Sequence, residues 1–245
     1  MGEDGYFDES VARRYDESGG PEFEAETIRS TVDFLAALAG NGRALELAIG
    51  TGRIAVPLAA RGIEVHGIDM SRAMVKRLRA KPGAKAIGAT IGDFSTTRVE
   101  GRFSLAYLVF NTIMNVTTQA AQVATFKNAS AHLEPGGCFV VEVGLPDLQR
   151  LPPGSRYVPF NVEPTHIGFD EYDVANQGLI SHHYELTRGR ARQLSVPFRY
   201  VWPSELDLMA ELAGMRLLER WEDWNREPFT SASLKHVSVW EKPRA

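Results

Sequence analysis

The stretch ALELAIGTGRIAVPLAARGIEVHGID, residues 44 to 69, combines two apolar segments with a glycine-rich turn between them. RALELAI predicts a buried strand, because it is a short apolar run that ends in turn residues. Gly50 and Gly52 predict a tight turn, and a helix is expected from about Arg53 to Arg61, with Pro57 tolerated only near its first turn. GIEVHGID then predicts a second strand. A strand, a glycine turn, a helix and a strand in this order indicate a βαβ unit with a ligand at its first turn.

The same alternation continues on both sides of this unit. A helix is expected before it, from about Glu22 to Leu38, since apolar residues recur there at helical spacing. After it come a helix capped by Ser71, a short strand at 85–89, a buried strand at 103–110, a helix capped by Thr117 or Thr118, and the strand CFVVEV. Such alternation implies right-handed crossovers and a mainly parallel sheet with helices on both faces.

The pattern changes after Gly144. A segment rich in Pro and Gly is followed by three strand-like stretches, THIGFDEYDVA, GLISHHYELTR and ARQLSVPFRYVW. We interpret residues 145–202 as an antiparallel β lid inserted into a core of residues 1–144 and 203–245. The basic residues of TRGRARQ, which are Arg188, Arg190 and Arg192, are expected at a solvated hairpin end. The lid strands could also form the interface of a homodimer.

Composition excludes several classes of protein. The chain has 245 residues, 44% of them apolar, and a net charge of -4 without an evident basic face, which disfavours nucleic acid as a partner. Its single cysteine, Cys138, cannot form an intramolecular disulfide, and the acidic N-terminus lacks the features of a signal peptide. No apolar run reaches the roughly 20 residues that span a bilayer. We therefore expect a cytoplasmic protein that does not insert into membranes.

Two classes of cofactor could use the glycine turn, because both need close approach of the backbone and the free N–H groups at the start of a helix. Gly50-x-Gly52-x-x-Ala55, with Asp69 nineteen positions after Gly50, fits a dinucleotide fingerprint. Glu46, however, lies near the carboxyl end of the first strand. Its carboxylate would repel a pyrophosphate but attract the amino group of S-adenosylmethionine. The residues therefore favour S-adenosylmethionine.

Three successive motifs, ALELAIGTGRIAVPLAARGIEVHGIDMS, IGDF and HLEPGGCFVVEV, resemble those of the class I S-adenosylmethionine-dependent methyltransferases over residues 20–144. The resemblance implies an α/β fold with a doubly wound, seven-stranded, mainly parallel Rossmann-like sheet that the last fifty residues complete. It also implies S-adenosyl-L-methionine as the cofactor and S-adenosyl-L-homocysteine as the product. Ala48 departs from the pattern, because the family usually has the first glycine of the loop there.

The resemblance carries cofactor contacts over to individual positions. The loop at 46–52 matches the segment that holds the methionine moiety, and Asp69 matches the acid that binds both ribose hydroxyls. Met70 would pack on adenine, and Asp93 matches the acid that binds the adenine amino group. The expected cofactor-binding residues are Glu46, Ala48, Gly50, Gly52, Arg53, Asp69, Met70, Gly92, Asp93, Phe94 and Phe110.

Methyl transfer from a sulfonium is an in-line displacement, so the protein mainly aligns a nucleophile and excludes water. A neutral amine attacks unaided, whereas a hydroxyl benefits from a His, Asp or Glu base. His182 and His183 point to opposite faces of one strand, so at most one of them faces the site. The candidate catalytic residues are Asn111, Tyr6, Tyr15 and His182, and no metal site is expected.

The resemblance to small-molecule and natural-product methyltransferases implies a small substrate bound between core and lid. We favour transfer to an amine nitrogen, as in an amino sugar or amino acid, with a hydroxyl or a peptide N-terminus as alternatives. From the residues alone, an NAD(P)-dependent oxidoreductase and a non-catalytic cofactor-binding scaffold stay open. The oxidoreductase leaves IGDF and LEPGG unexplained, and the scaffold requires a filled substrate pocket.

Overall fold

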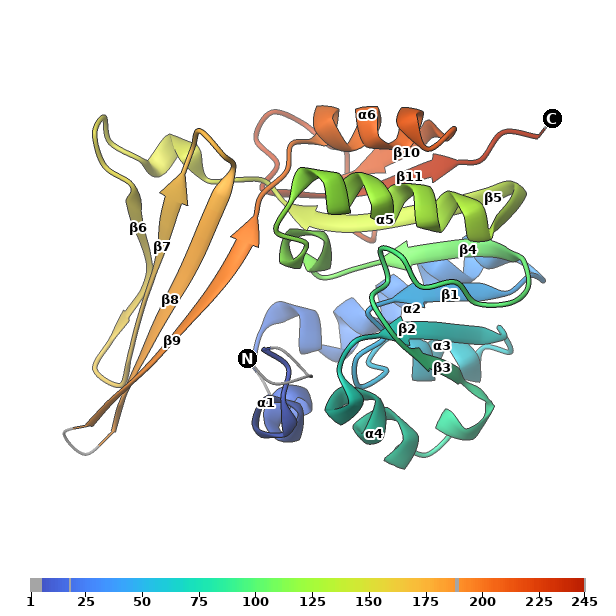
Figure 1. Cartoon of the computed structure of the whole chain (residues 1–245), viewed down its shortest axis with the longest axis horizontal. Helices are drawn as coiled ribbons and strands as arrows, with labels where there is room; N and C mark the ends of the chain where they lie inside the picture. Colours follow the sequence, from blue (N-terminus) through green and yellow to red (C-terminus); the bar gives the residue numbers. More distant parts are fainter. Residues whose placement is uncertain (1–5, 18, 188–189, 245) are drawn as a thin grey trace.

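The computed structural model describes residues 6–17, 19–187 and 190–244, so Arg188 lies outside the described residues. A seven-stranded sheet lies between two layers of helices, and a second sheet of four strands projects from one side of it (Figure 1). The order across the large sheet is β10 (Arg216–Trp221), β11 (Lys235–Glu241), β5 (Leu133–Gly144), β4 (Phe103–Leu108), β1 (Ala44–Leu47), β2 (Val65–Asp69) and β3 (Gly88–Ile91).

The direction of the strands places the ligand-binding edge of this sheet. Strands β5, β4, β1, β2 and β3 are parallel, whereas β11 is antiparallel to β5 and β10 is antiparallel to β11. Strand order reverses between β1 and β4, and ligands bind at the carboxyl ends of the strands at such a point. The predicted seven-stranded, mainly parallel sheet is confirmed.

Helices bury both faces of the sheet with separate apolar cores. Leu35, Leu58 and Leu78 lie in one cluster, and Phe126 and Met209 lie in the other. The helices over the first face are α2 (Ala25–Ala39), α3 (Ala55–Ala60) and α4 (Arg72–Ala80), and those over the second are α5 (Gln119–His132) and α6 (Pro203–Leu212). The short helix α1 (Glu9–Arg14) packs on α4, on the side of the core that faces the lid (Figure 1).

Local predictions differ in how well they place the elements. Ser71 and Thr118 cap α4 and α5 with their hydroxyl oxygens, as expected. The strand expected at 85–89 instead runs from Gly88 to Ile91, because the left-handed Gly83 leads into a turn of 3-10 helix at Ala84–Ala86. The order of helices and strands is therefore predictable from the sequence. The ends of a strand that follows a helix through a tight turn are not.

The four-stranded sheet contains β6 (Tyr157–Glu163), β7 (His166–Asp173), β8 (Gly178–Thr187) and β9 (Arg190–Arg199), all antiparallel and in this order. The sequence predicted β7 to β9 but left β6 in a segment rich in Pro and Gly. Pro159 lies in β6, which pairs only with β7. An edge strand tolerates proline, because one row of its N–H groups has no partner strand. Within the described ranges, no helix has the length and apolar character needed to cross a bilayer.

Candidate active site

The glycine loop follows β1 and is tethered to the end of β2. The Gly50 N–H donates to Asp69 Oδ2 at 2.7 Å, and the Ser71 N–H donates to Asp69 Oδ1 at 2.8 Å. Gly50 and Gly52 have φ angles of 56° and 77°, and a Cβ at Gly52 would collide with Leu78. The turn therefore favours glycine at both positions, and at Gly52 the packing of Leu78 adds a second reason. Asp69 fixes the loop at the sheet edge where the cofactor is expected.

Ala48 has a φ of 60°, in the left-handed region that alanine rarely adopts. Replacing it with glycine should raise the free energy of unfolding by about 1 kcal/mol, because the Cβ that disfavours this conformation is removed. Chemical denaturation measures the change. Ala37→Gly, in the exposed part of α2, is the matched control and should lower the free energy of unfolding by about as much. A less stable Ala48→Gly variant would contradict the assigned conformation.

A small cavity lies where the loop, the end of β4 and the N-terminal segment meet. Six of the predicted site residues line it, namely Tyr15, Glu46, Ala48, Gly50, Arg53 and Phe110. Thr51, Val109 and Thr112 also line it, although the sequence analysis did not single them out. The cavity holds about 30 Å³, room for about one water molecule. A cofactor can enter only if the surrounding side chains move apart.

Glu46 supplies a buried carboxyl group to this cavity. Only 4% of the residue is exposed, and the Tyr107 hydroxyl donates to Glu46 Oε2 at 3.0 Å. Burial raises the pKa of Glu46 to about 8, although the hydrogen bond from Tyr107 and the charge of Arg53 both lower it. A carboxyl group in this environment gains most from a ligand that brings a positive charge.

Aromatic rings of the N-terminal segment close the cavity. We call residues 6–17 and 19–24 the cap. Tyr15 packs edge-on against Phe23 at 5.5 Å between ring centroids, and Phe23 packs in the same way against Phe110 at 6.1 Å. The guanidinium of Arg53 lies over the rings of Phe23 and Phe110 and donates to the backbone carbonyl of Glu22. Arg53 therefore joins the loop to the cap.

Polar contacts hold the cap over the loop. The Thr51 hydroxyl donates to Asp16 Oδ1 at 2.6 Å, and Asp16 also pairs with Lys81 at 2.8 Å. The Ser71 hydroxyl donates to the carbonyl of Phe7 at 2.6 Å. Asp16 and Thr51 are 35 residues apart, so no local pattern could reveal their contact. The acidic character of the N-terminus was the only visible signal.

Asn111 lies at the end of β4 but uses its side-chain oxygen within the protein. Phe110 and Asn111 have φ angles of 59° and 56°, so the chain turns sharply there. Asn111 Oδ1 accepts a hydrogen bond from the Gly144 N–H at 2.6 Å, which joins the ends of β4 and β5. The turn of 3-10 helix η4 (Thr112–Asn115) follows directly. Asn111 therefore shapes this rim, and it does not line the small cavity.

The other predicted cofactor residues lie along the same sheet edge, outside the small cavity. Met70 is 54% exposed beside Asp69, and the Gly92 N–H donates to the Asp69 carbonyl at 2.9 Å. Asp93 is exposed and accepts from the Ser95 N–H at 2.8 Å. Phe94 packs on the apolar core under α5 and α6. These residues form an open continuation of the site at the ends of β2 and β3.

The two faces of the lid differ in what they contact. Leu179 of β8 belongs to an apolar cluster that includes Met114 of η4, so its face of the sheet is the inner one. His183 lies on this face, because alternate residues of a strand share a face. His182 lies on the outer face, where it contacts Ser195 at 2.8 Å and Glu171 at 3.2 Å. The structure therefore does not bring His182 to the cavity.

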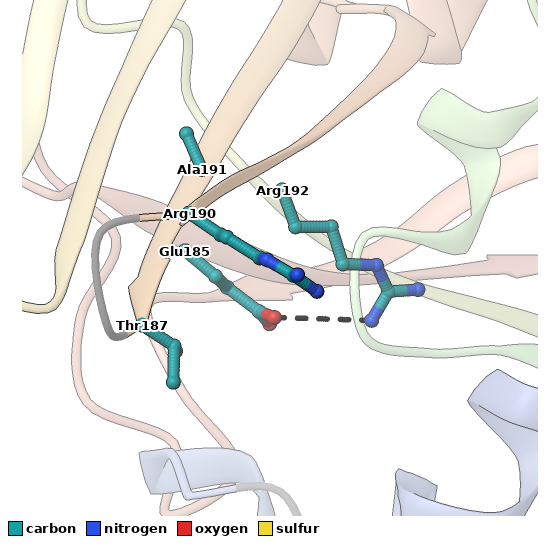
Figure 2. A pocket seen from close by; sticks show the side chains of 5 residues that line it. All are labelled: Glu185, Thr187, Arg190, Ala191 and Arg192. Atoms are coloured by element: carbon teal, nitrogen blue, oxygen red, sulfur yellow. Dashed lines mark ion pairs between the residues drawn. The ribbon is translucent and has the colours of Figure 1, made fainter.

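The lid tip carries a hollow of its own. Glu185, Thr187, Arg190, Ala191 and Arg192 line a hollow of about 680 Å³ there, and Arg192 pairs with Glu185 at 3.8 Å (Figure 2). Burial raises the pKa of Tyr6, and the charges of Arg192 and Glu185 in the lid also act on it. Among the described residues, no group of three or more His, Cys, Asp or Glu side chains is placed to hold a metal ion.

The donor set fits S-adenosylmethionine. Glu46 offers a carboxyl group for an ammonium, and Asp69 lies at the strand end where a ribose would bind. The glycines leave room for a ligand to approach the backbone. Glu46 would therefore bind the amino group of the cofactor's methionine part and Asp69 its ribose, and Arg53 and Phe110 would border the cofactor near Glu46.

Comparisons with known proteins agree with this fit. A family described as "Methyltransferase domain" matches residues 44–137. The putative methyltransferase YqeM of Bacillus subtilis (strain 168) is 32% identical over 110 residues, and this match spans 44% of each protein, less than half of YqeM. The CalS10 amino pentose methyltransferase of Micromonospora echinaspora, solved with S-adenosylmethionine bound, shares the fold at 20% identity, with a TM-score of 0.69 over 96% of this chain and 97% of that one.

A solved structure extends the likeness to nearly the whole chain. The CcbJ methyltransferase of Streptomyces caelestis is 37% identical, with a TM-score of 0.85 over 96% of each chain. This match includes the cap and the lid as well as the glycine loop. It decides between the cofactor classes that the residues left open. The chain belongs to the class I S-adenosylmethionine-dependent methyltransferases.

Proposed function

We propose that the protein transfers a methyl group from S-adenosylmethionine to the amine nitrogen of a small acceptor bound between core, cap and lid. The observation that carries the proposal is the position of the lid, whose base packs on Met114 of η4, the turn that follows Phe110 at the small cavity.

Two considerations support nitrogen as the acceptor atom. Next to the expected position of the methyl group, the described residues that line the small cavity include no histidine, and their one carboxyl group, Glu46, is buried against Tyr107; His183 lies on the inner face of the lid instead. An amine needs no base once it is neutral, whereas a hydroxyl does. In addition, the relative CalS10 is an amino pentose methyltransferase.

The division of labour follows from the two sheets. We propose that residues 1–144 and 203–245 bind the cofactor and that residues 145–202 hold the acceptor. Bound S-adenosylmethionine supplies a methyl group on a positively charged sulfur, which becomes a neutral thioether when the carbon–sulfur bond breaks. The rings of Tyr15, Phe23 and Phe110 exclude water from the reacting atoms. Tyr6, Tyr15 and the Asn111 amide would orient the amine so that its lone pair is in line with that bond.

Methyl uptake from labelled S-adenosylmethionine tests the proposal directly. The acceptor panel contains amino sugars and amino acids, each paired with the analogue in which a hydroxyl replaces the amine. We expect labelled product from at least one amine and none from its hydroxyl partner. Labelling of hydroxyl analogues alone would overturn the choice of nitrogen. A long peptide and a nucleic acid complete the panel, and uptake into these two alone would overturn the choice of a small acceptor.

A further inference from the structure

A buried polar network joins the base of the lid to the core. Arg199, the last residue of β9, is 6% exposed. Its Nη2 donates to Glu205 Oε1 in the first turn of α6 at 2.7 Å and to Gln177 Oε1 in the turn before β8 at 3.1 Å. Gln177 Nε2 in turn donates to Glu205 Oε2 at 2.7 Å. Three side chains from the lid base and α6 thus satisfy one another.

The same network reaches the rim of the cofactor cavity. Arg199 Nη1 donates to Gln122 Oε1 in α5 at 2.5 Å, and Gln122 is fully buried. Gln122 Nε2 donates to the carbonyl of Ile113 at 3.1 Å and to that of Arg199 at 3.2 Å. Ile113 belongs to η4, the turn that follows Phe110 and Asn111. One guanidinium therefore connects the lid base, two core helices and the rim.

We propose that Arg199 is a positioning residue that fixes the orientation of the lid relative to the cofactor cavity, and so governs the use of the acceptor but not the binding of the cofactor. This inference rests on the proposed function, in which the acceptor lies against the lid. The planar fork of arginine suits the role, because it bonds several acceptors at fixed angles. A lysine would keep the charge but not these angles.

The length of the lid makes its base a sensitive point. Strand β8 has 10 residues, and at about 3.3 Å per residue it extends roughly 30 Å. A rotation of about 5° at the base then moves the tip by about 3 Å, by simple geometry on that length. Misplacement of reacting groups by about 1 Å can lower a rate on the order of a hundredfold. A small change in orientation at Arg199 is therefore expected to cause a large displacement of the lid residues that contact the acceptor.

The experiment compares Arg199→Gln with Arg220→Gln. Arg220 pairs with Asp207, also on α6, at 2.6 Å and is partly buried, but it contacts no lid residue in the described pairs. Spin labels on cysteines introduced at Val162 of the lid and Lys127 of α5, both exposed, report the lid-to-core distance by electron–electron double resonance. Cys138 stays unlabelled, because it is buried and burial raises its pKa to about 11.

We expect a single narrow distance in the unaltered protein and in Arg220→Gln, and a broader distribution in Arg199→Gln. S-adenosylhomocysteine affinity should stay within about twofold in both variants, since none of the side chains that Arg199 contacts lines the cofactor cavity. The kcat/KM for the amine that takes up the labelled methyl group should fall on the order of tenfold or more in Arg199→Gln, but not in Arg220→Gln. Arg199→Lys keeps the positive charge, and should be more stable than Arg199→Gln, but its distance distribution should stay broad.

Gln177→Ala covers the case in which Arg199→Gln does not fold, because it leaves the pair between Arg199 and Glu205 in place. It should broaden the distance in the same direction. An unchanged narrow distance in these variants, or an equal loss of S-adenosylhomocysteine affinity and acceptor turnover, would overturn the role of Arg199. Failure of the proposed function looks different, because it would leave every amine unmethylated by the unaltered protein while the distances still changed.

Discussion

Replacing Asp69 with alanine is expected to weaken S-adenosylhomocysteine binding by more than about tenfold, the effect of losing about 1.5 to 3 kcal/mol of charge-assisted hydrogen bonds. The resemblance assigns the ribose hydroxyls to this carboxylate. The structure adds a second reason, because Asp69 also accepts from the N–H groups of Gly50 and Ser71 and so holds the loop in place. Calorimetric titration measures the loss.

A control separates loss of the ligand contact from general destabilisation. Asp33→Ala removes an exposed pair with Arg61 at 2.5 Å on the outer side of α2 and should leave the affinity unchanged. Thermal unfolding of both variants identifies any loss of fold. If folded Asp69→Ala bound S-adenosylhomocysteine as tightly as the unaltered protein, the assignment of the ribose site would be wrong.

Raising the pH from about 6 to about 8 is expected to strengthen S-adenosylhomocysteine binding, by up to about tenfold per pH unit. In the free protein burial raises the pKa of Glu46 to about 8, so below this pH the side chain is mostly a neutral acid. An ammonium beside it favours the carboxylate and lowers its pKa in the complex. Binding then releases a proton, and affinity rises with pH until Glu46 is ionised in the free protein as well.

Calorimetry in two buffers with different heats of ionisation counts the released protons. Glu46→Gln should show neither proton release nor the rise, and should differ from the unaltered protein more at high pH than at low pH. Tyr107→Phe removes the donor that stabilises the carboxylate, so the rise should shift to higher pH. The pKa of Tyr107 is itself raised, first by burial, so it stays a neutral donor throughout. Equal affinity of the unaltered protein at both ends of the range would contradict this account.

Patterns within one element predicted most of the core. Short apolar runs, the glycines at 50 and 52 and the caps at Ser71 and Thr118 depend on near neighbours, and each of these elements is present. The sequence predicts the third strand a few residues before its position at Gly88–Ile91, because the 3-10 turn that precedes the strand leaves no periodic pattern in the sequence. The sequence does not predict β6, because Pro159 is atypical of a strand and is tolerated only where the strand lies at a sheet edge.

The site was predicted in part for the same reason. Glu46, Gly50 and Arg53 lie in β1 and the loop after it, so one stretch of sequence predicts all three, and they line the cavity. The contact of Asp16 with Thr51 joins segments that only the fold brings together. The sequence does not show which face of the lid is the inner one, because that depends on the contact of Leu179 with η4, and His182 lies on the outer face. Self-association through the lid remains a prediction.

The central claim is that the glycine loop and its two carboxyl groups bind S-adenosylmethionine. Its most direct test is calorimetric titration of the purified protein with S-adenosylhomocysteine at about pH 8, with NADH and NADPH as parallel titrants. The account predicts micromolar binding of S-adenosylhomocysteine alone, with about one molecule per chain. Binding of either nicotinamide cofactor without binding of S-adenosylhomocysteine would contradict it.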